Sequence, residues 1–271
     1  MNHVVMFSGG IGSWAAAKRV AERDGTERLT LLFTDTLMED EDLYRFLEQA
    51  AANVGGHLVR LAEGRTPWEV FHDVRFLGNS RVDPCSRVLK REMSDGWLKA
   101  NCEPADTVVY IGIDWSESHR YDRLRDIRAT DGWNYQAPMC EAPYLTKPMM
   151  LDWLRAEGIE PPRLYAMGFA HNNCGGFCIK AGLGHFARLL LEMPERYRYH
   201  EEKEQALRDH LGRQDITIVR DWATRPPKNI TLRELRERIE AGHEPDLFDI
   251  GGCGCFVDEP EQPLASHQGK P

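Results

Sequence analysis

The stretch VVMFSGGIGS, residues 4–13, predicts how this chain folds. Its first four residues are apolar and predict a buried parallel strand. The glycine-rich residues 8–13 come next, and the sequence WAAAKRVAER that follows predicts a helix. Glycines between a strand and a helix let the backbone turn tightly and point its N–H groups at an anion, and the helix N-terminus adds partial positive charge. We therefore expect a phosphate-binding turn.

This turn differs from two common phosphate-binding motifs. It matches neither G-x-x-x-x-G-K-[ST] nor G-x-G-x-x-G. Taken alone, it is therefore also compatible with a glycine-rich turn in an ordinary α/β domain.

Alternating strand and helix patterns on either side of the turn predict the rest of the fold. We expect helices over residues 12–24 and after 39–42, and strands over residues 29–34, 57–61 and 107–113. This alternation is typical of an α/β protein with a doubly wound, mostly parallel sheet. Ligands of such sheets bind beyond the carboxyl ends of the strands, where residues 8–13 and Asp35 both fall.

Changes in composition divide the 271 residues into three expected parts. Residues 1–170 should form the domain that carries the turn, and residues 171–258 a helical, cysteine-rich C-terminal extension. Residues 259–271 are rich in proline and polar residues, so we expect a disordered tail.

Composition and charge narrow the class of protein. Hydrophobic residues make up 42% and charged residues 28% of the chain, which indicates a globular protein with a real core. We find no apolar run of membrane-spanning length and no signal peptide, so we expect a cytoplasmic protein. In that compartment, seven cysteines favour metal binding or redox chemistry over disulfides. A net charge of −9 argues against a general nucleic-acid-coating surface but is compatible with a local basic groove.

Cysteine spacing predicts a metal centre. Three residues, two of them glycines, separate Cys174 from Cys178, so both thiolates could reach one metal. Cys85 is a natural third ligand, and Cys253 or Cys255 could be the fourth. Ligation by thiolates alone favours a 4Fe–4S cluster or zinc. The alternative is buried apolar cysteine, which is a common environment for this residue.

Basic side chains supply candidate phosphate or sulfate ligands. Arg87, Lys90 and Arg91 have the spacing of one helical face, and Arg120 follows the end of the strand at 107–113. The alternative for each is an ordinary solvated surface charge.

Several of these motifs resemble the PP-loop adenine nucleotide alpha hydrolase superfamily. Residues 8–13 resemble its pyrophosphate loop, SGGxDS, and residues 33–36 (FTDT) resemble the acidic strand end that follows the loop in phosphoadenosine phosphosulfate (PAPS) reductases. Residues 85–91 resemble a cysteine-plus-basic helix of the same group. Residues 162–168 (PRLYAMG) and 174–178 (CGGFC) resemble its PLYxxG…GCxxC end. The resemblance covers roughly residues 1 to 200 with the motifs in order.

The resemblance implies a role for each matching residue. It implies that phosphates are bound by Ser8, Gly9, Gly10, Gly12 and Ser13. Their charge would be neutralised by Arg87, Lys90 and Arg120, and Asp35 would contact a metal or the ribose. Cys253 or Cys255 would supply a nucleophilic thiol. The sequence also departs from the family pattern. Gly12 replaces the loop aspartate that manages magnesium, so magnesium would fall to Asp35 or another acid. The ending GGCGC replaces ECGxH, and Cys85 stands alone where the reductases have a cysteine pair.

These implications lead to one preferred function and one alternative. The preferred function is an enzyme that binds ATP or a PAPS-like nucleotide and uses cysteine-bound iron–sulfur or zinc for sulfur transfer or reduction. Its acceptor would be a tRNA, a DNA base or other nucleobase, a free nucleotide or a sulfonucleotide, and the sequence leaves a homodimer open. The alternative is a non-catalytic regulatory protein that binds an adenine nucleotide and carries a structural zinc. Neither function involves a membrane.

Overall fold

Five parallel strands form the central sheet in the order β3–β2–β1–β4–β5. The computed structural model describes residues 1–79, 82–249 and 251. The strands are β1 (Asn2–Met6), β2 (Leu29–Asp35), β3 (His57–Ala62), β4 (Thr107–Tyr110) and β5 (Asn134–Gln136). The predicted α/β class with a doubly wound parallel sheet is confirmed. The strand order reverses between β1 and β4, and it is at such a reversal that open parallel sheets bind ligands.

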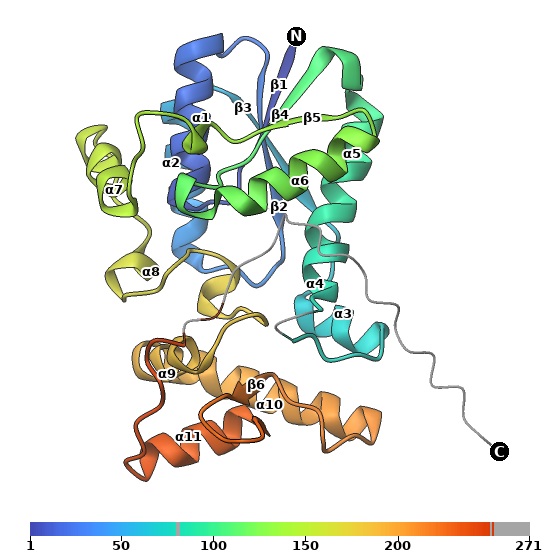
Figure 1. Cartoon of the computed structure of the whole chain (residues 1–271), viewed down its shortest axis with the longest axis vertical. Coiled ribbons are helices and arrows are strands. Elements are labelled where there is room, and N and C mark those ends of the chain that lie inside the picture. Colours follow the sequence, from blue (N-terminus) through green and yellow to red (C-terminus); the bar gives the residue numbers. More distant parts are fainter. Residues whose placement is uncertain (80–81, 250, 252–271) are drawn as a thin grey trace, which may run out of the picture.

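Helices cover both faces of the sheet, and more helices follow at its carboxyl edge (Figure 1). The α-helices are α1 (Ile11–Asp24), α2 (Glu41–Val54), α3 (Pro67–Asp73), α4 (Pro84–Ser86), α5 (Met93–Asn101), α6 (Ser118–Thr130), α7 (Lys147–Ala156), α8 (Arg163–Ala166), α9 (Leu183–Glu192), α10 (Pro194–Leu211) and α11 (Leu232–Glu240). A π-helical segment, η1 (Arg87–Glu92), joins α4 to α5. A hairpin of β6 (Val219–Asp221) and β7 (Lys228–Ile230) lies between α10 and α11.

Alternation along the strands builds a core on each face of the sheet. Val5 and Phe7 pack with α1, α2 and α7, whereas Val4 and Met6 pack with α5 and α6. Successive side chains of a strand point to opposite faces, so the continuous apolar run at the start of the chain fills both cores at once.

A third core joins the C-terminal helices to the first half of the chain. It contains Trp68 and Phe71 from α3 and Met38 from the loop before α2, together with side chains of α9, α10 and α11. Residues on either side of position 170 therefore share one core.

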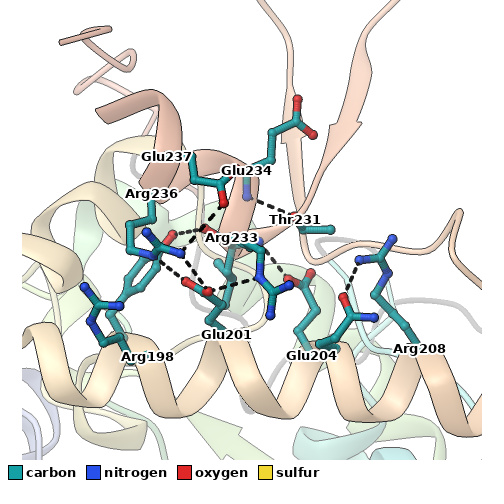
Figure 2. A network of polar contacts seen from close by, with 12 residues as sticks. Arg198, Glu201, Glu204, Arg208, Thr231, Arg233, Glu234, Arg236 and Glu237 are labelled. Carbon is teal, nitrogen blue, oxygen red and sulfur yellow. Dashed lines mark hydrogen bonds and ion pairs between the residues drawn. The ribbon is translucent and has the colours of Figure 1, made fainter. Parts of the chain in front are cut away.

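A polar network fastens α11 and the hairpin to α10 (Figure 2). Arg236 binds Glu201 through two hydrogen bonds of 2.8 and 3.0 Å. Glu204 is buried and accepts hydrogen bonds from the backbone N–H groups of Ile218 at 2.9 Å and Leu232 at 2.7 Å. The Glu204 carboxylate of α10 thus satisfies one backbone donor just before the hairpin and one at the start of α11.

Two further predictions concern the C-terminal end and the membrane. Cys253, Cys255 and the tail expected over residues 259–271 lie outside the described residues. Across the described ranges, every helix is too short or too polar to cross a membrane.

Candidate functional site

A cavity of about 600 Å³ opens at the carboxyl ends of β1 and β4, and we call it the loop cavity. Its wall combines the glycine-rich turn with three other segments. The lining includes Ser8, Gly10, Gly12 and Ser13 from the turn, Asp114, Glu117 and Arg120 after β4, Lys147 at the start of α7, and Tyr165, His171, Asn172, Asn173 and Gly251 from the C-terminal part. The cavity thus lies at the reversal of strand order, where the fold predicts a ligand site.

Two glycines of the turn have different roles. Gly9 has φ +75°, and a Cβ there would lie 2.9 Å from Cγ of Leu43, so this position requires glycine. A Cβ on Gly10 would meet the Tyr165 hydroxyl at 3.5 Å and Ser8 Oγ at 3.6 Å, which are ordinary contacts. Gly10 therefore accommodates a small side chain, and a larger one would extend into the cavity that it lines.

Gly12 occupies the position of the aspartate in the PP-loop pattern SGGxDS, and its surroundings explain the difference. A Cβ on Gly12 would lie 2.6 Å from the carbonyl oxygen of Gly112, beyond the end of β4. A Cβ on Gly112 would lie 2.6 Å from the backbone nitrogen of Ser13. The two backbones approach so closely that neither position has room for a side chain.

The N-terminus of α1 lies at the wall of the loop cavity. Gly10 is its N-cap and has no side chain that could cap the helix, while the Tyr165 hydroxyl accepts the backbone N–H of Ile11. The Ser13 hydroxyl donates to the Gly10 carbonyl at 2.8 Å, and Gly12 and Ser13 both line the cavity. The partial positive charge of this helix N-terminus therefore faces a space large enough for an anionic ligand.

The C-terminal half of the chain holds the turn from outside. The backbone N–H of Ile11 donates to the Tyr165 hydroxyl at 3.0 Å, and the Asn172 amide donates to the Gly9 carbonyl at 2.9 Å. Lys147 donates to the Ala170 carbonyl and lies 5.8 Å from the centre of the Tyr165 ring. Sequence reasoning missed Asn172. The polar run AHNN just before Cys174 was the available signal.

His171 contributes a neutral imidazole to the cavity wall. Its Nδ1 is buried without a hydrogen-bond partner among the described residues, and its ring stacks on that of His185 at 5.4 Å. Burial, with a smaller effect from His185, lowers the pKa of His171 to about 3. An uncharged ring can donate or accept one hydrogen bond, so His171 suits a polar uncharged group of a ligand.

Arg120 and Lys147 bring positive charge to the loop cavity, and Asp114 and Glu117 bring negative charge. Arg120, in the first turn of α6, donates a hydrogen bond to Glu117, which precedes the helix. Asp114 accepts a hydrogen bond from the backbone N–H of Ser116 at 2.9 Å. Both carboxylates therefore have local partners while they line the cavity.

Three other candidate nucleotide ligands lie outside this lining. Asp35 is 7% exposed and accepts hydrogen bonds from the Leu37 N–H at 2.8 Å and the Tyr44 hydroxyl at 3.0 Å. Arg87 lies on η1 with its Nε 3.6 Å from Glu92. Lys90 is 3% exposed, because η1 turns it inward. The functional roles inferred for these side chains stay predictions.

Lys90 lies next to a buried carboxylate. Its Nζ is 4.0 Å from an oxygen of Glu39, which also accepts hydrogen bonds from the Thr36 hydroxyl at 2.9 Å and from the Cys174 backbone N–H. Burial raises the pKa of Glu39, and Lys90 opposes that shift. Glu39 thus links the end of β2, the π-helical segment η1 and the loop that carries Cys174.

The loop that carries Cys174 and Cys178 does not form a metal site with the other described residues. Across residues 1–79, 82–249 and 251, no three His, Cys, Asp or Glu side chains gather so that they could hold a metal ion. Cys174 and Cys178 are buried in the third core, and Cys85 packs against the same core. The metal centre predicted from Cys85, Cys174 and Cys178 is therefore not found in the described structure, and its fourth ligand, Cys253, falls outside it. Packing among apolar side chains is the environment that the alternative interpretation predicted.

Comparisons with known proteins find similar solved structures, two of which we describe. No protein-family model matches the chain, and no curated protein matches it. One similar structure is the PAPS reductase from Candida auris in a phosphate complex, with 16% identity, a TM-score of 0.43, and coverage of 62% of this chain and 77% of that chain. Another is the NH3-dependent NAD synthetase from Campylobacter jejuni subsp. jejuni NCTC 11168 with nitrate ion, with 12% identity, a TM-score of 0.36, and coverage of 78% and 83%. At this level of identity and overlap, neither similarity identifies the reaction of this chain.

Proposed function

We propose that this chain is an enzyme of the PP-loop superfamily that binds the phosphates of an adenine nucleotide in the loop cavity. The observation that carries the proposal is the turn itself: the N-terminus of α1 and the open position Gly10 line a cavity of about 600 Å³ at the reversal of strand order. The ordered set of PP-loop motifs supports adenine as the base.

The residues of the cavity suggest how it would act on a nucleotide. Backbone N–H groups at the start of α1 and the Ser8 and Ser13 hydroxyls would hold phosphate oxygens, and Arg120 and Lys147 would balance their charge. Asp114 and Glu117 are the carboxylates of the lining, so they would hold a magnesium ion that arrives with ATP. Such a site would release pyrophosphate from ATP or accept an already activated nucleotide such as PAPS.

Substitutions at two glycines test the nucleotide site. Gly10→Val should weaken ATP or PAPS binding at least tenfold, because its branched side chain extends into the cavity, while the melting temperature stays close to that of the wild type. Gly96→Val is the matched control, because no atom lies within 4 Å of the Cβ position on α5. Titration calorimetry gives both affinities. Binding by Gly10→Val at wild-type affinity would show that the phosphates lie elsewhere.

Sulfur chemistry is the second part of the proposal, and Gly251 supports it. This residue lines the loop cavity, pairs with Ala181, and precedes Cys253 by two positions in the sequence. Cys253 or Cys255 would then supply the nucleophilic thiol, or a ligand to a 4Fe–4S cluster or zinc shared with Cys85, Cys174 and Cys178.

Metal analysis and turnover separate the enzyme from a regulatory protein. After anaerobic purification, we expect bound iron and sulfide that fall sharply in Cys174→Ser, and pyrophosphate release or nucleotide reduction that falls in Cys253→Ser or Cys255→Ser. A protein with one zinc and no iron would exclude the iron–sulfur centre. Nucleotide binding without any turnover, tested with tRNA, DNA and free nucleotides as acceptors, would favour the regulatory alternative.

A further inference from the structure

A second cavity of about 600 Å³ lies between the segment after α3, the C-terminal end of α10 and the β6–β7 hairpin. We call it the hairpin cavity. It shares no described lining residue with the loop cavity, and nothing in the nucleotide proposal uses it.

Three arginines from three different segments line the hairpin cavity. They are Arg75 after α3, Arg213 after α10 and Arg220 on β6, and Asp215 is the one carboxylate in the described lining. Asp215 is engaged by Arg213 through two hydrogen bonds of 2.7 Å. Arg75 contacts His210 at 3.5 Å, and within the described residues no carboxylate forms an ion pair with Arg220. In a chain of net charge −9, this cavity therefore concentrates uncompensated positive charge.

An exposed aromatic ring accompanies the arginines. Along β6, Val219 and Asp221 are buried, so the alternation of a strand leaves Arg220 and the following Trp222 outside. The Arg220 guanidinium lies 4.8 Å from the centre of the Trp222 ring, and Trp222 is 54% exposed. A large indole held against a guanidinium and left open to solvent is a surface on which a flat ring can stack.

We propose that the hairpin cavity binds a segment of single-stranded nucleic acid. An unpaired base stacks on Trp222 beside Arg220, and Arg75 and Arg213 contact the phosphates on either side. Sites for single strands combine these two features, a stacking ring and a cationic groove. An acidic peptide would match the arginines equally well but would leave the indole without a function, so the observations favour a polynucleotide.

Binding of fluorescent oligothymidylate and oligouridylate of about 12 nucleotides, measured by anisotropy at low salt, tests the proposal. Trp222→Ala should weaken binding roughly fivefold to a hundredfold, the range expected when one stacked base is lost, and Trp222→Phe should retain most of it. Arg220→Ala should also weaken binding and make it less dependent on salt. A preference for either oligonucleotide assigns the strand as RNA or DNA, and equal binding of both also supports the site.

Arg28→Ala is the matched control, because this exposed arginine lies just before β2, at the amino edge of the sheet. The proposal is overturned if neither oligonucleotide binds the wild-type chain, or if Arg28→Ala weakens binding as much as Arg220→Ala. It is also overturned if oligoglutamate or inorganic phosphate displaces the strand at equal charge concentration. ATP binding by Trp222→Ala should equal that of the wild type, so failure here stays distinct from failure of the nucleotide proposal.

Discussion

At the scale of single residues, the glycines of the turn are not equivalent. Gly9 is required by its backbone angle, Gly12 by the approach of the Gly112 carbonyl, and Gly10 only by the cavity that it lines. The glycine at position 12 therefore reflects packing of α1 against the end of β4. An aspartate at this position would have to displace the backbone of Gly112, even if its carboxylate could help to bind a nucleotide.

Gly12→Asp, which would complete the pattern SGGxDS, should destabilise the protein. Its Cβ would lie 2.6 Å from the Gly112 carbonyl oxygen, and overpacking of this kind costs about 1–3 kcal/mol. Thermal unfolding should show a fall of several degrees, with weaker nucleotide binding. Gly10→Ala is the control, because its nearest neighbours lie at 3.5 Å, and it should unfold close to the wild-type temperature. A Gly12→Asp protein as stable as the wild type would contradict this account.

At the scale of secondary-structure elements, local sequence patterns predicted the strands, turns and helices better than they predicted the positions of individual side chains. The apolar runs of β1 and β2 and the turn between β1 and α1 could be identified because strand, turn and helix signals are local. The inward position of Lys90 could not, because it depends on a π-helical segment and on Glu39 from another element. Tyr165 and Asn172 reach the turn across more than 150 residues, and such contacts leave no pattern in a single sequence.

The attachment of α11 to α10 should depend on pH through Glu204. This side chain is 1% exposed, and burial raises its pKa to about 7, although the N–H groups of Ile218 and Leu232 oppose the shift. A raised pKa in the folded state means that the protonated form is favoured there. Its contribution to stability is therefore complete below the unfolded-state pKa and is lost as the pH rises through about 7.

Urea unfolding of the wild type and Glu204→Gln at about pH 5 and pH 8 tests this dependence. Between these values the wild type should lose up to about 3 kcal/mol more than the variant, because glutamine does not titrate. Glu204→Gln should also be less stable at the lower pH, since its amide can accept only one of the two backbone hydrogen bonds. An identical change in the free energy of unfolding for both proteins would assign the pH dependence to other groups.

At the scale of the whole molecule, charged side chains fasten the C-terminal helices to the carboxyl edge of the sheet. Asp40, fully buried at the N-terminus of α2, accepts hydrogen bonds from Arg163 at 2.7 and 2.8 Å. Arg196 of α10 lies 3.5 Å from the same carboxylate and donates to the carbonyl of Met38 at 2.8 Å. The N-terminus of α2 is thus held by residues more than 120 positions away.

A double-mutant cycle measures how much this fastening contributes. We expect Asp40→Ala and Arg163→Ala to be coupled by about 1–2 kcal/mol in the free energy of unfolding, because the carboxylate is buried while the arginine is half-exposed and partly screened. Asp40 also caps α2 by accepting a hydrogen bond from the Asp42 N–H at 3.0 Å. The stability lost with this cap is the same in Asp40→Ala and in the double mutant, so the cycle cancels it.

The exposed pair of Asp152 and Arg155 on α7 supplies a matched cycle with the same two residue types. Their side chains are 75% and 56% exposed and three positions apart on one helix, so their coupling should stay below about 0.5 kcal/mol. If the two cycles give equal couplings, the contact between the sheet edge and the C-terminal helices rests on apolar packing alone. If the first coupling is larger, as we expect, Asp40 connects α2 to α8, whose Tyr165 lines the loop cavity, and weakening this contact should also lower nucleotide affinity.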